Sequence, residues 1–236
     1  MRKLFSCLAI ILLAVLPILA ETASASKITN EDDRLRNCGF VIKGILDISD
    51  NIPQDLLDRA DCVLVFPTVL RATHIDGGSY GRGAMTCRQG YDFKGPWGAT
   101  TMMVLEGGNF GYQIDGKDTD LVLLVMNERG ADAILSREIK LGADTLSAAG
   151  PVGRDLLTES CEVQRAEILS YARARGLLSG VSLAGSTIHP DNGNNRRVYG
   201  REIPARDITL SGTVAVLPAA WELISTLDRK TPKRRA

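Results

Sequence analysis

The chain has 236 residues, of which 44% are hydrophobic and 24% are charged, and basic and acidic residues are equal in number. This composition is typical of a globular protein and excludes a disordered one. Because the formal net charge is zero, there is no global basic field to hold nucleic acid, and no nucleic-acid partner is expected. A charged partner must therefore meet a local patch.

Residues 1–25 have the layout of a secretory signal peptide. Arg2 and Lys3 precede a nearly unbroken apolar run, Leu4–Ala20, and small residues follow, so cleavage is expected after Ala20 or Ala25. An uncleaved membrane anchor is the alternative, but about 17 apolar residues are marginal for a bilayer span. We expect a domain at 26–228 and then a basic tail, 229–236, that is predicted to be disordered.

Four cysteines follow this segment, and none forms a C-x-x-C pair, so no zinc site is expected. They are Cys38, Cys62, Cys87 and Cys161. An oxidising compartment permits up to two disulfides, in three connectivities, while buried free thiols are the alternative.

Asn30 can cap a helix whose first turn is acidic, and apolar residues then recur at helical spacing. They are Leu35, Cys38, Ile42, Ile45 and Leu46. One interpretation is a helix that covers the core. The alternative is a membrane-surface helix whose flanking cations meet anionic headgroups, although the acidic first turn weakens it.

A short helix is expected to start at Pro53, and the apolar run Cys62–Phe66 predicts a buried strand. Pro67 then implies a sheet edge or a bulge, because proline donates no ladder hydrogen bond. The segment Asp120–Met126 is apolar on both faces, which predicts a central strand. Asn127 is expected to cap a helix, Arg129–Arg137.

Glycine is concentrated at 76–117, which holds 11 of the 23 glycines between short strand-like pieces at 84–87, 99–105 and 110–114. Asp115-Gly116 is a hairpin turn sequence. Glycine at this density is tolerated where the backbone bends or approaches another backbone closely. The predicted fold class is therefore α+β: a curved, mostly antiparallel, glycine-rich sheet or barrel-like core, with N-terminal helices, a short middle helix and a C-terminal helix.

The second half of the chain is less distinct. Residues 166–175 fit both a helix and an alternating strand, and Pro190–Asn195 (PDNGNN) predicts a loop. Pro218 is expected to start a last helix whose apolar face is Trp221, Ile224 and Leu227.

Ser79 lies in a G-x-S-x-G sequence, the pattern of a hydrolase nucleophile elbow, with His189 downstream. The elbow requires a helix directly after the serine, whereas Arg82–Thr86 is strand-like, and His189 is expected in a loop. We interpret Ser79 as a polar turn residue and keep a serine hydrolase as a remote alternative.

No other motif indicates a cofactor or a metal. Asp115, Asp118 and Asp120 lack the spacing, glycine and closing glutamate of a calcium loop, and only two histidines occur. Neither nucleotide-binding glycine loop is complete.

Several blocks, in this order along the chain, resemble the SYLF domain, a lipid-binding family of bacterial envelope and eukaryotic actin-patch proteins. The blocks are 60–67 (ADCVLVFP), 77–84 (GGSYGRGA), 97–99 (WGA), 107–115 (GGNFGYQID), 119–127 (TDLVLLVMN), 140–144 (KLGAD), 149–154 (AGPVGR), 171–185 (YARARGLLSGVSLAG) and 199–200 (YG). The resemblance covers about 30–228.

The resemblance implies a non-enzymatic module that binds anionic membrane phospholipid. Because this chain begins with a secretory segment and lacks an SH3 or FYVE module, we expect bacterial envelope lipids in the periplasm, peripheral to the membrane. Phosphoinositides and actin are not expected as partners. Arginine suits phosphate because its planar fork donates two hydrogen bonds to one anion. The candidate lipid-binding residues are Arg34, Arg36, Lys43, Arg71, Arg82, Arg196 and Arg197. The alternative is an envelope structural module with a protein partner.

Overall fold

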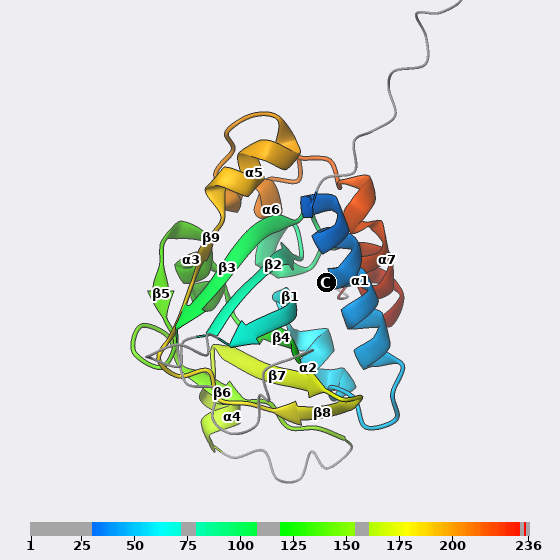
Figure 1. Ribbon diagram of the computed structural model, residues 1–236, viewed down its shortest axis with the longest axis vertical. Coiled ribbons are helices and arrows are strands. Elements are labelled where there is room, and N and C mark those ends of the chain that lie inside the picture. Colours follow the sequence, from blue (N-terminus) through cyan, green and yellow to red (C-terminus); the bar gives the residue numbers. More distant parts are fainter. Residues whose placement is uncertain (1–29, 72–78, 108–118, 154–160, 232–233, 235–236) are drawn as a thin grey trace, which may run out of the picture.

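The computed structural model describes residues 30–71, 79–107, 119–153, 161–231 and 234. The expected signal peptide, the strand expected at 110–114 and the hairpin expected at Asp115-Gly116 lie outside these residues. A curled, mostly antiparallel sheet forms the middle of the molecule, and helices cover much of both faces (Figure 1). The predicted α+β class is therefore confirmed.

The described strands form one open, half-barrel sheet with the order β5-β9-β3-β2-β1-β4-β7-β6, and β8 also pairs with β7. Every pair is antiparallel except β6 with β7. The strands are β1 (Cys62–Arg71), β2 (Ser79–Cys87), β3 (Thr101–Gly107), β4 (Thr119–Val125), β5 (Ile139–Lys140), β6 (Ser147–Ala149), β7 (Ile168–Ala174), β8 (Leu177–Gly180) and β9 (Ser186–Pro190).

The helices are α1 (Asn30–Leu46), α2 (Gln54–Arg59), α3 (Glu128–Ser136), α4 (Cys161–Arg165), α5 (Asn192–Tyr199), α6 (Ala205–Leu210) and α7 (Trp221–Lys230), with 3₁₀ turns η2 (Tyr91–Phe93) and η5 (Pro218–Ala220). The cap expected at Asn127 is present. Asn127 accepts a hydrogen bond from the backbone N–H of Gly130 at 2.9 Å and so caps α3.

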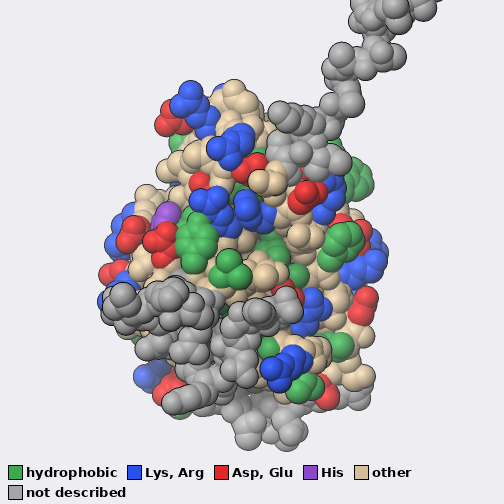
Figure 2. Space-filling view, in the orientation of Figure 1, with side chains coloured by type: hydrophobic (Ala, Val, Ile, Leu, Met, Phe, Trp, Pro, Cys, Tyr) green, Lys and Arg blue, Asp and Glu red, His purple; other side chains and the backbone are tan. Residues whose placement is uncertain are grey.

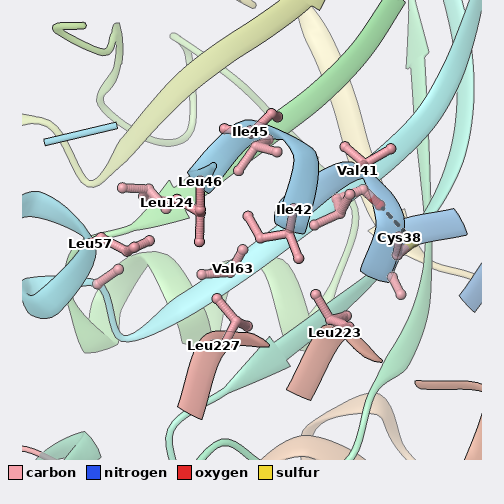
Figure 3. Packing of buried hydrophobic residues seen from close by; sticks show 14 of the residues in the cluster. Cys38, Val41, Ile42, Ile45, Leu46, Leu57, Val63, Leu124, Leu223 and Leu227 are labelled. Atoms are coloured by element: carbon pink, nitrogen blue, oxygen red, sulfur yellow. Dashed lines mark hydrogen bonds between the residues drawn. The ribbon is translucent and has the colours of Figure 1, made fainter. Parts of the chain in front are cut away.

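One face of the sheet packs against α1 and α7. Ile42 and Ile45 of α1 lie against Val63 of β1, and Leu223 of α7 completes the layer (Figure 3). The predicted apolar face of α1 is thus confirmed as a core face. Each such side chain contributes about 1.5–3 kcal/mol when it is fully buried.

The opposite face packs against α3 and α6. Alternate residues of β4 serve the two cores, because successive strand side chains point to opposite faces. Leu121 and Leu123 join Ile134 of α3, whereas Val122 and Leu124 join α1. This two-sided burial confirms the central strand that the apolar sequence predicts.

A bulge interrupts β1 at Pro67, as the sequence predicts. The register with β2 shifts between Val65 and Leu70, and the register with β4 shifts between Phe66 and Val69. The strand is nevertheless interior, so the alternative of an edge is wrong here.

A disulfide joins Cys62 and Cys87, which face each other across the β1–β2 ladder. Cys38 is buried and free, and Cys161 is exposed and free. The sulfur of Cys38 donates to the carbonyl oxygen of Val65 at 3.4 Å. Burial raises the pKa of this thiol to about 12.

In the second half the structure decides one open alternative and corrects two expectations. The ambiguous segment 166–175 contains strand β7, not a helix, because its alternating residues serve both faces of the sheet. The loop expected at Pro190–Asn195 is wrong except at Asp191: Pro190 ends strand β9, and Asp191 caps α5 by accepting a hydrogen bond from the backbone N–H of Asn194. His189 lies on strand β9, not in a loop.

The C-terminal helix also differs from the prediction. Ile224 and Leu227 are buried as predicted, but Trp221 is 65% exposed, and Leu223 joins them on the buried face instead. The helix continues through Lys230, past the predicted boundary at 228. The expected disorder is also wrong for Thr231 and Arg234: Trp97 donates to the Thr231 hydroxyl at 2.9 Å, and Arg234 donates to Asp61 at 2.7 Å.

Candidate functional site

The structure confirms the reason for rejecting a nucleophile elbow at Ser79. This residue begins strand β2, where it pairs with Gly107 and Arg71, and the chain continues as strand through Cys87. No helix follows Ser79, so the strand-to-helix turn that would present a nucleophile is absent.

Between α1 and the ends of β1, β2 and β3, none of the described helices covers the sheet. We call this region, defined by Leu70, Tyr80 and Arg82, the open sheet face. Leu70 pairs with Tyr80, and these side chains are 56% and 36% exposed. Glu106 of β3 faces Tyr80 across the ladder and bounds the region on that side. An apolar side chain, an aromatic ring and a guanidinium therefore share one solvent-exposed surface.

Arg82 stands over the ring of Tyr80. Its guanidinium carbon lies 5.6 Å from the ring centroid, and its Nε donates to the Tyr80 hydroxyl. Arg82 also pairs with Asp191, with 3.9 Å between Nε and the carboxylate oxygen. Because the Arg82 side chain is 44% exposed, much of its hydrogen-bonding edge faces solvent.

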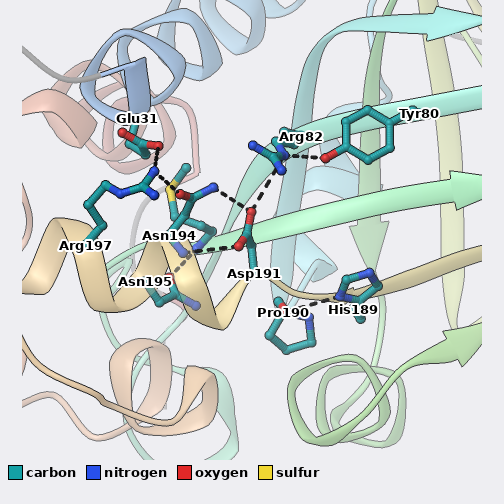
Figure 4. A network of polar contacts seen from close by, with 10 residues as sticks. Glu31, Tyr80, Arg82, His189, Pro190, Asp191, Asn194, Asn195 and Arg197 are labelled. Carbon is teal, nitrogen blue, oxygen red and sulfur yellow. Dashed lines mark hydrogen bonds and ion pairs between the residues drawn. The ribbon is translucent and has the colours of Figure 1, made fainter.

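Helix α5 connects the open sheet face to the start of α1 (Figure 4). Asp191 accepts hydrogen bonds from the backbone N–H of Asn194 at 3.1 Å and from its side chain at 2.7 Å. Arg197 then donates to the side-chain oxygen of Asn194 at 2.7 Å and to Glu31 at 2.6 Å. The side chains thus form a chain of contacts from β2 to α1.

Glu31 lies at the far end of this chain of contacts. Burial on its own would raise the pKa of this carboxyl, but a backbone hydrogen bond and the neighbouring Arg197 and Arg34 together lower it. Glu31 is therefore a buried carboxylate whose charge is balanced by two arginines from different helices.

Arg34 lies on the side of α1 that borders the open sheet face. It precedes Cys38 by one helical turn, Cys38 lies over Val65, and Val65 pairs with Ala84, two residues beyond Arg82. The Nη1 atom of Arg34 is buried and has no hydrogen-bond partner among the described residues. Buried donors normally have a partner, so this atom requires an explanation.

The structure thus brings together three of the seven predicted residues, which we call the arginine cluster: Arg34, Arg82 and Arg197. Figure 2 shows basic and apolar side chains adjoining on this face of the molecule. Cations next to apolar surface are the composition of an anion-binding interface with a membrane.

The other predicted residues lie elsewhere. Arg36 pairs with Asp33 at 3.1 Å on the outer side of α1, and Lys43 points toward α7, where it pairs with Glu222 at 3.2 Å. Arg196 is exposed on α5. Arg71 ends β1 at the rim of the sheet, and its side chain lies outside the description.

The sequence analysis missed Leu70, Tyr80 and Asp191. Tyr80 belongs to the G-x-S-x-G pattern, which was interpreted through its serine. The two-residue spacing of Tyr80 and Arg82 in a strand could have indicated that they share a face. The role of Asp191 was not predicted because its segment was interpreted as a loop.

Nothing in the described ranges indicates a metal centre or a membrane-spanning helix. These residues contain no group of three or more histidine, cysteine, aspartate or glutamate side chains placed to hold an ion. None of their helices is long and apolar enough to cross a bilayer.

The fold and this surface define an α+β domain that presents a mixed cationic and apolar face. The Ysc84 family, described as Las17-binding protein actin regulator, matches residues 106–230. The chain therefore belongs to this family of SYLF-domain proteins, as the sequence blocks indicated.

Curated relatives share the domain. The chain is similar to an SH3 domain-containing protein of Schizosaccharomyces pombe, with 34% identity over 76% of this chain and 41% of the relative. Protein YSC84 of Saccharomyces cerevisiae is 30% identical over 76% of this chain and 38% of its own length. The human SH3 domain-containing YSC84-like protein 1 is 29% identical over 77% and 52%, respectively. The chain thus spans about two fifths to one half of these relatives.

Proposed function

We propose that this protein binds anionic membrane phospholipid without catalysing a reaction, and that the arginine cluster is the headgroup site. The main supporting observation is the state of Arg34. Its buried Nη1 has no hydrogen-bond partner among the described residues, and it acts on Glu31, where the chain of contacts from the half-exposed Arg82 ends. Phosphate oxygens are strong acceptors that pair with guanidinium groups, often in bidentate geometry. A bound phosphate would give the Nη1 of Arg34 an acceptor.

The open sheet face supplies the apolar part of the contact. Leu70 and the ring of Tyr80 lie at the solvent surface next to Arg82. Tyrosine suits a membrane interface because its ring is apolar and its hydroxyl is polar. Cations and apolar groups would then meet the headgroups and the upper acyl layer together.

The proposed location is the periplasm of a bacterium, with peripheral attachment to a membrane. Two features support it. The first 25 residues have the layout of a signal peptide, and the Cys62–Cys87 disulfide suits an oxidising compartment.

Vesicle flotation tests the proposal. Purified protein is mixed with vesicles of neutral phosphatidylcholine, or of phosphatidylcholine with phosphatidylglycerol, at low and high salt. We expect flotation with the anionic vesicles at low salt and a marked loss at high salt, because exposed charges are screened. Equal flotation with both kinds of vesicle at low salt would contradict the proposal.

A protein partner is the second candidate function. The family is described as Las17-binding, and the S. cerevisiae relatives include LAS seventeen-binding protein 3. At the end of the sheet opposite the open sheet face, Tyr91 is 93% exposed, on a loop with positive φ at Gly90 and Asp92. An envelope protein that is retained after detergent has stripped the lipid, and lost with Tyr91→Ala, would support this function.

A further inference from the structure

Two hollows meet beside the turn between β7 and β8. One, of about 340 Å³, is lined by Gly44, Ile48, Asp120, Arg173, Arg175 and Gly176. The other, of about 710 Å³, is lined by Ile48, Ser49, Asp50, Val152, Gly153, Gly176, Leu177 and Leu178. They share Ile48 and Gly176, so a hollow with two arginines adjoins a larger one whose walls are partly aliphatic and partly polar. Both volumes lie in the range of small-molecule sites, about 300–1,000 Å³.

The residues of the β7–β8 turn are exposed. Arg175 and Gly176 both have positive φ, of 51° and 81°, which is the geometry of a tight two-residue hairpin. Leu177 directly follows the turn and is 77% exposed. A single exposed leucine is common on a protein surface and needs no explanation. Leu177, however, closely follows Arg175 and lines the larger hollow.

Arg173 is held in place by two neighbours. Its Nε and Nη2 donate to Asp120 at 3.1 and 2.7 Å. Its Nη1 lies against Gly44, where a Cβ would be only 2.3 Å away. The glycine therefore leaves room for a guanidinium beneath α1, and the Asp120 pair orients it.

The hairpin lies at the same end of the sheet as the open sheet face. Ala174 pairs with Leu177 and with Thr119, and Thr119 pairs with Val69, which precedes Leu70. A membrane that contacts Leu70 and Tyr80 would thus also lie near the β7–β8 turn.

We propose that these paired hollows bind one anionic phospholipid molecule, separately from the arginine cluster. The phosphate lies at Arg175 with Arg173 behind it, and one acyl chain lies along Ile48, Val152, Leu177 and Leu178. Asp120 is paired with Arg173, and Asp50 lines the larger hollow but not the one that contains Arg175. This inference rests on the proposed lipid-binding function and adds a specific, single-molecule site.

Native mass spectrometry with dihexanoyl phosphatidylglycerol, used below its micelle concentration, tests the site. The wild-type chain is expected to form a one-to-one adduct, and glycerophosphoglycerol, which has the headgroup but no acyl chains, is expected to form none. Leu177→Ser and Arg175→Gln should each weaken the adduct about tenfold or more. The first removes a leucine that the bound acyl chain would cover, and the second removes a charged contact with the phosphate. Leu146→Ser and Arg59→Gln are the controls, since they remove an exposed leucine and an exposed arginine elsewhere.

The outcomes separate the two proposals. If the wild type floats with anionic vesicles but forms no adduct, or if the adduct is unchanged in Leu177→Ser and Arg175→Gln, the hollow site is wrong and the arginine cluster stands. If the adduct forms but flotation shows no preference for anionic vesicles, the arginine cluster is wrong. If glycerophosphoglycerol, which has no acyl chains, also forms an adduct, the proposed acyl contact is wrong.

Discussion

The carboxylate of Asp120 accepts a hydrogen bond from the backbone N–H of Thr68 at 3.1 Å, across the β1–β4 ladder at the Pro67 bulge. Thr68 has φ of 53°, a left-handed conformation that a branched residue rarely adopts. The other carboxylate oxygen holds Arg173. One aspartate therefore fixes the bulge and also positions the hairpin arginine.

We predict that Asp120→Ala destabilises the protein by about 2–4 kcal/mol, because it leaves a partly buried guanidinium and a strained bulge without their acceptor. Urea unfolding measures the change. Asp33→Ala is the control: it breaks an exposed pair with Arg36 and should cost at most about 0.5 kcal/mol. Similar losses for the two variants would contradict this role of Asp120.

We predict that Gly44→Ala destabilises the fold by about 1–3 kcal/mol, since the added methyl group would overlap the Arg173 guanidinium. Gly193→Ala in α5 is the matched control, because a Cβ there meets only Asp191, at an ordinary 3.7 Å. Alanine has the higher helix propensity, so the control should be neutral or stabilising. Thermal unfolding of both variants provides the comparison.

The pH dependence of stability should contain a contribution from Glu31. Its folded pKa lies below the ordinary value of 4.5, so the unfolded state binds the proton more readily than the folded state. The stabilisation is therefore complete above about pH 4.5 and is lost as the pH falls through the folded pKa. Comparing the wild type with Glu31→Gln from pH 3 to 7 should show a stability difference that shrinks on acidification. A difference that is constant over this range would contradict the assignment.

The two free thiols should differ sharply in reactivity. Cys161 is exposed, whereas Cys38 is buried and its pKa is raised to about 12, so Cys38 has almost no thiolate at pH 8. Native protein treated with iodoacetamide should be labelled at Cys161 and not at Cys38, as read by peptide mass spectrometry. Equal labelling would show that the face of α1 that carries Cys38 is not packed against the sheet.

Reduction of the Cys62–Cys87 disulfide, which closes a separation of 25 residues, should cost about 2–4 kcal/mol. Urea unfolding with and without reductant measures this cost. Cys161→Ser should leave it unchanged.

The fold was predictable where local patterns were strong. The apolar stripe of α1, the two-sided burial of β4 and the bulge at Pro67 all follow from residue spacing and backbone chemistry. Helix α5 did not, because Asp-Asn-Gly-Asn-Asn is typical of a turn, and its helical state depends on the Asp191 cap and on contacts with Glu31 and Thr101. Tertiary contacts of this kind override local propensity.

The candidate site was predictable only in part. Arg34, Arg82 and Arg197 could be named as basic residues, but their common location depends on β2, α1 and α5 meeting in space. Arg173 and Arg175 were missed because the segment around them was ambiguous between helix and strand. The hairpin that presents them becomes visible only once β7 and β8 are paired.

The proposed headgroup site is tested most directly by the contribution of the arginine cluster to the affinity for an anionic bilayer. Titration of phosphatidylglycerol vesicles should show at least about tenfold weaker binding for Arg34→Gln/Arg82→Gln than for the wild type, given about 1 kcal/mol for each cation near an anionic surface and more for a direct phosphate contact. Arg59→Gln/Lys94→Gln, which removes the same charge at the opposite end of the sheet, should bind like the wild type. Equal weakening in both double variants would show that only overall charge matters, and no weakening in either would contradict the site.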